Sequence, residues 1–114
     1  MQSGVAIQTI PNTPGVHRIA YTPGFSTVCS IGKAPFYGTL QIEYSPAELL
    51  LEFESFEAWL FGLSNQSTTI EDLCRLVFNR LTEALGDIPL SVTVHAMTTV
   101  HAQTSATITR ENCV

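Results

Sequence analysis

Two residues have types and positions suited to covalent or recognition chemistry. The first is Cys29, which stands near the end of a β-rich segment, just before a turn that contains Lys33. A thiol beside a cation and free turn amides can lose its proton readily and act as a nucleophile. Ser30 and the turn amides could polarise a substrate held there. The alternative is that Cys29 is a small buried apolar residue, as most unpaired cysteines are.

The second residue is Glu71, in the first turn of a predicted helix. The helix dipole and the free amides of that turn favour a carboxylate. Such a carboxylate, held at a rigid helix start, can accept two hydrogen bonds from the N–H and amino edge of a purine-like ring. The structural alternative is that Glu71 only completes a capping box with Thr68.

His95 and His101 are placed on the polar side of the last two predicted strands. They could donate protons or contact a ligand, and the alternative is that they are solvated or lie at an interface. The one other histidine is His17, and the chain has no HxH or HExxH motif, so a metal site is not expected. No Gly-rich phosphate loop or GxSxG motif supports nucleotide hydrolysis or serine-hydrolase chemistry.

Alternating residues predict the strands that position Cys29. Residues 25–31 alternate after the break at Pro23-Gly24, and residues 38–45 alternate after a turn at 32–35. The two segments are expected to pair as an antiparallel hairpin. After Pro89, residues 90–97 and 100–108 alternate again and predict two more half-buried strands.

Two helices are expected between the strand pairs. Ser55 is a plausible N-cap for a helix over 56–63, with Glu57 in its first turn. The second helix starts at the Thr68/Glu71 pattern and ends at Gly86 as its C′ residue. Its apolar stripe has helical spacing and comprises Ile70, Leu73, Cys74, Val77, Phe78, Leu81 and Leu85.

The resulting order, ββααββ, predicts an α+β fold with a four-stranded antiparallel sheet and two helices on one face. Residues 1–15 are expected to form an irregular arm, 16–110 a single domain and 111–114 a tail. Two open sheet edges are a liability for a lone chain, and closure into a β-barrel with copies of itself would remove them.

Composition narrows the function classes. The 114 residues are 45% hydrophobic and 13% charged, about half the usual ~25%, which suggests a surface partly covered by other subunits. A net charge of −5 with scattered basic residues disfavours nucleic acid as a partner, although tRNA is not excluded. No segment predicts a membrane span or a signal peptide, and three widely spaced cysteines suggest reduced thiols, so we expect a cytoplasmic protein.

Five segments, taken in order, resemble the QueF-type nitrile reductases of the queuosine pathway. The segments are FSTVC at 25–29, Pro35, GTLQIEY at 38–44, EFESFEAWL at 52–60 and residues 65–71. The resemblance covers roughly residues 20–109. It implies the tunnelling fold, a ββααββ unit whose subunits join their sheets into a barrel, with sites between subunits in a ring or stacked rings.

The resemblance also implies roles for single residues. The cysteine matched by Cys29 attacks the nitrile of 7-cyano-7-deazaguanine to form a thioimide, and the glutamate matched by Glu71 anchors the heterocycle. Ser55 and Ile70 fall at positions that the resemblance places beside the substrate. In the family, NADPH then reduces the thioimide.

The chain departs from the family where protons and reductant are handled. Phe36 replaces the aspartate that handles the proton, and Ile70 replaces a histidine before the anchoring glutamate. Glu54 and Glu57 replace two lysines suited to NADPH phosphates, so the local charge changes sign and would repel a phosphate.

We therefore expect an enzyme that uses Cys29 on a nitrile without NADPH, giving an amidine or a related product as the archaeosine branch of the family does. His101, or His95, would replace the missing aspartate as proton donor. The first alternative is an NADPH-dependent 7-cyano-7-deazaguanine reductase. The second is a catalytically degenerate binding or structural ring, which Phe36 favours because an apolar neighbour offers no proton.

Overall fold

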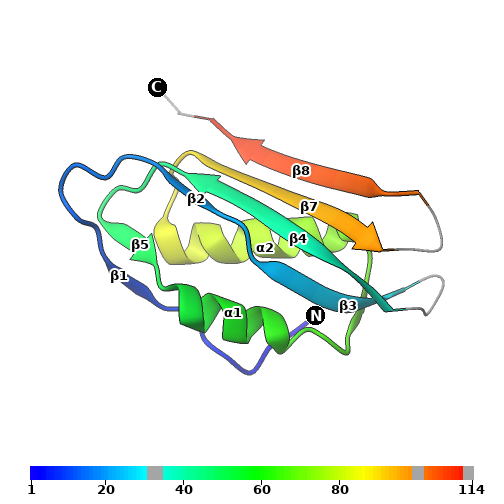
Figure 1. The fold of residues 1–114 in the computed structure, drawn as a ribbon. Coiled ribbons are helices and arrows are strands. Elements are labelled where there is room, and N and C mark those ends of the chain that lie inside the picture. Colours follow the sequence, from blue (N-terminus) through cyan, green and yellow to red (C-terminus); the bar gives the residue numbers. More distant parts are fainter. Residues whose placement is uncertain (31–34, 99–101, 112–114) are drawn as a thin grey trace.

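The computed structural model describes residues 1–30, 35–98 and 102–111, and it describes only the backbone at Cys29, Pro35 and Thr98. Its elements follow the chain in this order: β1 Thr9–Pro11, β2 Ile19–Tyr21, β3 Gly24–Cys29, β4 Pro35–Tyr44, β5 Leu49–Leu51, α1 Phe53–Phe61, β6 Ser67–Thr68, α2 Ile70–Leu85, β7 Leu90–Thr98 and β8 Thr104–Arg110. The long strands form one curved sheet (Figure 1).

The main sheet has the order β6-β3-β4-β7-β8, with β2 also paired to β4. The predicted hairpin is confirmed, since β3 pairs with β4 in antiparallel register, as β4 does with β7 and β7 with β8. Strands β2 and β3 lie end to end along β4, separated at Pro23, whose carbonyl accepts a hydrogen bond from Leu40 N at 2.8 Å. The predicted last strand begins at residue 104 in the described chain, and positions 99–101 lie outside it.

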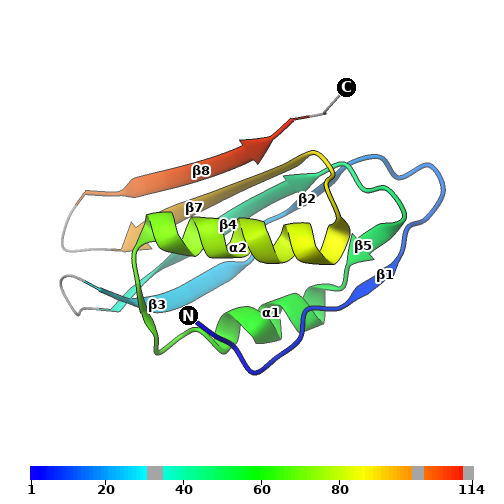
Figure 2. The same ribbon diagram turned by 180° about the vertical axis from the view of Figure 1, so that it is seen from behind.

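The two faces of the sheet differ as the alternation predicts. Leu40, Ile42 and Tyr44 are buried on one face, while Gln41 and Glu43 are exposed on the other. Both helices lie on the buried side, as Figures 1 and 2 show from opposite directions. The expected α+β architecture, with two helices on one face of the sheet, is therefore confirmed. The sheet has six strands rather than the predicted four, because β2 also pairs with β4 and the short strand β6 joins β3 in parallel.

Helix α2 follows its predicted stripe, with all members buried except the half-buried Ile70. Its N-cap differs from the prediction. Thr69, rather than Thr68, accepts the hydrogen bond from Asp72 N at 3.1 Å, so the capping pair is Thr69 and Asp72 and does not include Glu71. Gly86 ends the helix with a φ of +90°, a conformation that glycine adopts at little cost.

Helix α1 starts earlier than predicted. Its N-cap is Glu52, whose carboxylate accepts hydrogen bonds from Glu54 N at 2.7 Å and Ser55 N at 2.9 Å. The prediction of Ser55 as N-cap is therefore wrong. A glutamate is an unusual N-cap, and the Ser55 hydroxyl instead donates to the Glu52 carbonyl and accepts from Gln8 N.

The N-terminal segment is more ordered than an irregular arm. Thr9–Pro11 forms β1 and pairs with β5 in a separate two-stranded sheet. Residues 1–8, which we call the N-terminal strap, run along α1 (Figure 2). Gly62 after α1 lies against this strap, because a Cβ there would come within 2.2 Å of the Ser3 hydroxyl.

Gly38 is required by close backbone packing in the sheet. The register between β4 and β7 shifts between Tyr37 and Gly38, as at a β-bulge. A Cβ at position 38 would lie 1.9 Å from the His95 carbonyl oxygen, so only glycine fits without a backbone shift.

None of the helices in the described chain is long and apolar enough to cross a membrane.

Candidate functional site

The end of β3 meets the start of α2 at one corner of the sheet. Cys29 pairs with Thr68 of the short strand β6 in parallel register. Two main-chain hydrogen bonds flank it, Val28 N to Gln66 O at 3.2 Å and Ser30 N to Thr68 O at 3.0 Å. We call this place, defined by Val28–Ser30 and residues 66–71, the β3–β6 corner. Since Glu71 follows Thr68 by three residues, the backbone brings the two predicted key positions together.

Glu71 is well placed to meet a ligand from this corner. It is exposed in the first turn of α2, and it makes no hydrogen bond or ion pair with the described residues. Thr68, its predicted capping partner, instead donates its hydroxyl proton to the Thr69 carbonyl at 3.2 Å. The Glu71 carboxylate is thus not used to cap α2, which removes the main structural alternative for it.

Phe36 occupies the position at which the resemblance predicts an aspartate. It pairs across the strands with Thr27 and is only 6% exposed. Its ring makes an edge-to-face contact with Phe25 at 5.7 Å between centroids. The side chain is therefore part of the core, and it can neither donate nor accept a proton beside Cys29.

His95 does not lie beside Cys29 within one chain. It pairs with Thr39, which in turn pairs with Gly24, five residues before Cys29 along β3. At ~3.3 Å per residue, the two backbones are roughly 16 Å apart along the sheet. His101, the other predicted proton donor, lies outside the described residues.

Ser55 and Ile70, both predicted near the substrate, have different surroundings. Ser55 sits at the start of α1, and its hydroxyl bonds to Glu52 O and Gln8 N, both at 2.9 Å. Ile70 is the first residue of α2 and packs half-buried against the core. Ile70 is the sequence neighbour of Glu71. Ser55 lies in the first turn of α1, whereas the chain leads to the β3–β6 corner from the last turn of that helix.

Helix α1 brings carboxylates together where the resemblance predicts lysines. Glu52 caps the helix, and Glu54 and Glu57 are exposed on its first turns. Glu57 accepts a hydrogen bond from the Tyr21 hydroxyl at 2.7 Å, and the Tyr21 ring stacks on Phe53 with centroids 4.3 Å apart.

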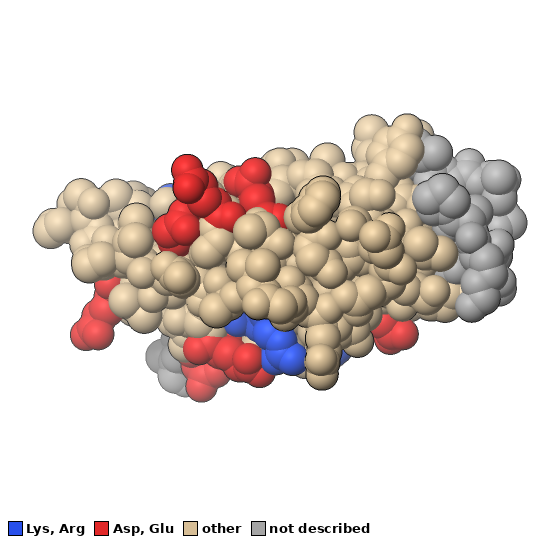
Figure 3. All heavy atoms as spheres, turned by 90° about the horizontal axis from the view of Figure 1, so that it is seen from below, with Lys and Arg blue, Asp and Glu red and all other residues tan. Residues whose placement is uncertain are grey.

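Burial raises the pKa of the Tyr21 phenol well above its usual range, and the hydrogen bond to Glu57 and the charges of Glu57 and Glu52 raise it further. Figure 3, which views the molecule from the side of α1, shows acidic side chains in several separate places, one group of them beside basic side chains. Near the start of α1, Glu52, Glu54 and Glu57 put three carboxylates within six residues.

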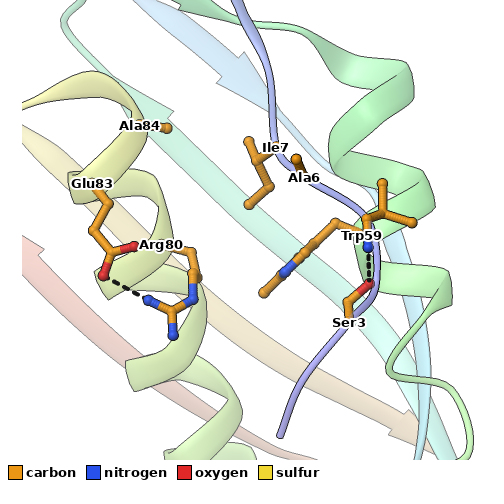
Figure 4. A pocket seen from close by; sticks show the side chains of 8 residues that line it. Ser3, Ala6, Ile7, Trp59, Arg80, Glu83 and Ala84 are labelled. Carbon is orange, nitrogen blue, oxygen red and sulfur yellow. Dashed lines mark hydrogen bonds and ion pairs between the residues drawn. The ribbon is translucent and has the colours of Figure 1, made fainter.

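A cavity of the described chain lies away from the β3–β6 corner. It has a volume of about 330 Å³ between the N-terminal strap, α1 and α2, with Trp59 on one side and an Arg80–Glu83 ion pair at 2.6 Å on the other (Figure 4). None of the predicted site residues lines it. Groups of three or more potential metal ligands are absent from the residues that the structure describes.

Comparison with known proteins identifies the family. A family model described as QueF-like protein matches residues 35–113. The chain belongs to the QueF-like family. The resemblance inferred from the sequence is thereby confirmed.

Named relatives and a solved structure support this assignment. An NADPH-dependent 7-cyano-7-deazaguanine reductase of Anaeromyxobacter sp. (strain K) is 31% identical over 82% of this chain and 85% of its own length. A reductase of the same name from Desulfovibrio desulfuricans is 32% identical, and the chain spans only 45% of it. The crystal structure of an apo archaeosine synthase QueF-Like matches with a TM-score of 0.78 over 90% of this chain and all of its own, at 16% identity. That match confirms the expected tunnelling fold.

Two polar residues of this QueF-like protein near the corner escaped sequence reasoning. Thr27 is 2% exposed, and its buried hydroxyl oxygen has no hydrogen-bond partner within the described chain. Gln66 bonds through both its main chain and its side chain. For Thr27 the alternation of β3 was a usable signal, because it shares a face with buried Phe25. For Gln66 no local signal exists, because its partners Gln2 and Val28 are distant in the sequence.

Proposed function

We propose that this QueF-like protein binds a 7-deazapurine-like nitrile at the β3–β6 corner and attaches it covalently to Cys29. One observation carries the proposal: the backbone of Cys29 pairs with Thr68, three residues before Glu71, whose carboxylate has no partner among the described residues. The names of its relatives, 7-cyano-7-deazaguanine reductases, support the substrate class.

The first step forms one bond and moves one proton. The Cys29 sulfur adds to the nitrile carbon, the thiol proton goes to the nitrile nitrogen, and the product is a thioimide with no leaving group. Glu71 accepts the N–H and amino hydrogens of the heterocycle and fixes its orientation. The amide of Ser30 already bonds to Thr68 O, so only its side chain remains available to the substrate.

The second step proceeds without NADPH in this proposal. The cofactor's phosphates need cations, and the matching segment instead presents Glu54 and Glu57, so the residues present do not fit it. Ammonia, or an amine, adds to the thioimide carbon, and the Cys29 thiol departs with a proton. The product is an amidine, and no electrons are transferred.

A second copy of the chain completes the site in this proposal. Phe36 cannot move protons, and His95 of the same chain lies roughly 16 Å along the sheet from Cys29. Strand β8 pairs only with β7 among the described strands, which leaves an edge free for another subunit. A histidine, His95 or His101, of that neighbour would accept the thiol proton and pass it to the nitrile nitrogen.

Intact-mass measurement with 7-cyano-7-deazaguanine tests the covalent step. The wild-type protein is expected to gain the full mass of the nitrile, Cys29→Ala to gain none, and Glu71→Gln to lose most of the adduct at equal nitrile concentration. Asp72→Asn is the matched control, because Asp72 is equally exposed in the same turn. No adduct in the wild type, or an adduct that persists in Cys29→Ala, would reject the proposal.

Two other functions are each favoured by one observation. The relatives' names favour NADPH-dependent reduction, which predicts loss of NADPH absorbance when the nitrile is added and which fails if NADPH does not bind at millimolar concentration. The buried Phe36 favours a binding ring without catalysis. In that case the Cys29 thiol would react with an alkylating probe no faster than free cysteine.

A further inference from the structure

Gln66 is a junction of hydrogen bonds between two distant parts of the chain. Its main-chain N donates to Leu63 O at 3.0 Å, and its main-chain O accepts from Val28 N at 3.2 Å. Its side-chain Oε1 accepts from Gln2 N at 2.9 Å, and its Nε2 donates to Gly62 O at 3.0 Å and to Gln2 O. Every polar atom of Gln66 therefore has a partner, although the residue is only half-buried.

The main-chain side of this junction reaches the proposed nucleophile. Val28 directly precedes Cys29, and the hydrogen bond that Val28 N donates to Gln66 O is one of the two that flank Cys29. Strand β6 has only two residues, so few other contacts hold it against β3. The position of Gln66 thus decides how firmly this corner is held together.

The side-chain of Gln66 reaches the N-terminal strap, which is tied down at both ends of α1. At the start of α1, Gln8 N donates to the Ser55 hydroxyl at 2.9 Å and Gln8 O accepts from Glu52 N at 3.0 Å. At the end of α1, Ser3 lies against Gly62, and Trp59 lies beneath the strap beside Ser3 (Figure 4). The strap is therefore held over α1 and offers Gln66 a fixed main-chain partner.

We propose that Gln66 is a positioning residue for Cys29, and that the N-terminal strap holds it in place through the main chain of Gln2. This inference rests on the proposed function for its catalytic consequence only. Hydrogen bonds with the main chain of Gln2 fix the Gln66 side chain. The Gln66 carbonyl in turn accepts from Val28 N, and this keeps strand β6 paired with β3 at Cys29 and Thr68, three residues before Glu71.

The test uses amide hydrogen exchange, read residue by residue by NMR, in the full chain. Gln66→Ala is expected to speed exchange at Val28 and Ser30 roughly tenfold, as loss of a hydrogen-bonded clamp implies, with little change at Val94 in the core of β7. Gln2→Pro removes the Gln2 N–H and should act in the same direction. Gln2→Ala is the matched control, because it keeps both main-chain groups.

A third variant is aimed at the strap and keeps both the Gln66 side chain and its main-chain acceptor at position 62. The Cβ of Gly62→Ala would meet Ser3 and displace the strap, while the Gly62 φ of −63° suits alanine. It too should speed exchange at Val28 and Ser30. The double variant Gln66→Ala/Gln2→Pro should exchange no faster at Val28 and Ser30 than Gln66→Ala, because both substitutions remove the same contact between Gln2 and Gln66.

The results separate this inference from the proposed function. Unchanged exchange at Val28 and Ser30 in Gln66→Ala overturns the inference, as does equal acceleration at Val94, which would mean general unfolding. If exchange rises as expected, formation of the nitrile adduct should slow in Gln66→Ala and Gln2→Pro and not in Gln2→Ala. An unchanged rate of adduct formation would overturn the positioning role. No adduct in the wild type would reject the proposed function, and the hydrogen-exchange results alone would then test the link between the strap, Gln66 and Val28.

Discussion

Helices α1 and α2 lie on the same face of the sheet but are held by different means. α2 packs a continuous apolar stripe on β7 and β8 and is capped by Thr69, one residue before it begins. α1 is capped by an uncommon glutamate, and its flanks depend on Tyr21 and Gln8, which come from far earlier in the chain.

The difference shows where polar contacts between distant segments add to burial in holding this fold. The α2 side is an apolar core that local sequence patterns describe well. Helix α1 also buries Phe56, Trp59 and Leu60. Its start, the strap and the β3–β6 corner depend in addition on hydrogen bonds between distant segments, each worth little by itself. The proposed site lies between these two regions, since Glu71 belongs to α2 and Gln66 to the α1 side.

The largest expected effect is on the α2 side. Leu81 is fully buried, so Leu81→Ala should lower the free energy of unfolding by about 2–5 kcal/mol, from lost burial and the cavity left behind. Asn79→Ala, exposed on the same helix, is the control and should change it by about 0.5 kcal/mol at most. Urea denaturation measures both. A loss for Leu81→Ala no larger than the control's would contradict the view that burial dominates this side.

An intermediate loss of stability is expected where Arg110 of β8 forms hydrogen bonds with the end of α2. The guanidinium of Arg110 donates to Ile88 O at 2.9 Å, Thr82 Oγ1 at 3.1 Å and Gly86 O at 3.3 Å, and lies 5.0 Å from the centre of the Phe78 ring. Arg110→Ala should destabilise the fold by about 1–3 kcal/mol, because carbonyls at the helix end lose a charged donor.

Arg110→Lys should recover little of that loss, since one ammonium group cannot reproduce the guanidinium fork. Arg75→Ala is the matched control, because Arg75 also lies over the Phe78 ring, at 6.0 Å, but is exposed. Thermal unfolding of the three variants measures these losses. Full rescue by lysine, or an equal loss of stability in Arg75→Ala, would mean that Arg110 stabilises the fold through its charge and not through its hydrogen bonds.

The smallest effect is expected on the α1 side and depends on pH. Tyr21→Phe removes the hydrogen bond to Glu57 and should cost about 0.5–1.5 kcal/mol at pH 7. Burial, followed by the nearby carboxylates, raises the pKa of the Tyr21 phenol in the folded protein. The stabilisation is therefore complete below the unfolded phenol's pKa of about 10 and is lost as the pH rises above it.

Urea denaturation at pH 7 and near pH 11 checks this sign. The advantage of the wild type over Tyr21→Phe should shrink or reverse at the higher pH. Tyr37→Phe corrects for removal of an exposed phenol, as Tyr37 is 53% exposed. An advantage that grows with pH would contradict the assigned cause.

The sequence predicted the sheet, the helical pair and the α2 stripe because their signals repeat within a few residues. It misplaced the start of α1, because Ser55 has the residue type of a cap while its hydroxyl is engaged by Gln8, 47 positions away. It placed the cap of α2 one residue early, since Thr68 and Thr69 are both suitable and only the backbone geometry selects one.

The candidate site was predictable only where its signals are local in the sequence. Cys29 and Glu71 were chosen from their types and local context, and their proximity follows from a two-residue strand that no periodicity could reveal. The separation of His95 from Cys29 depends on strand register, which alternation alone does not define. The role of Gln66 depends on contacts with residues 2 and 28, and it has no signature in the surrounding sequence.

The buried thiol of Cys74 has a practical consequence for kinetic work on this protein. It donates to Val92 O at 3.3 Å and Ala106 O at 3.5 Å, and burial raises its pKa. A thiol held that way between α2, β7 and β8 can meet an alkylating reagent only when these elements separate. In a variant whose other two cysteines are replaced, the rate at which Cys74 is alkylated would report opening of the whole domain, with no reporter residue introduced.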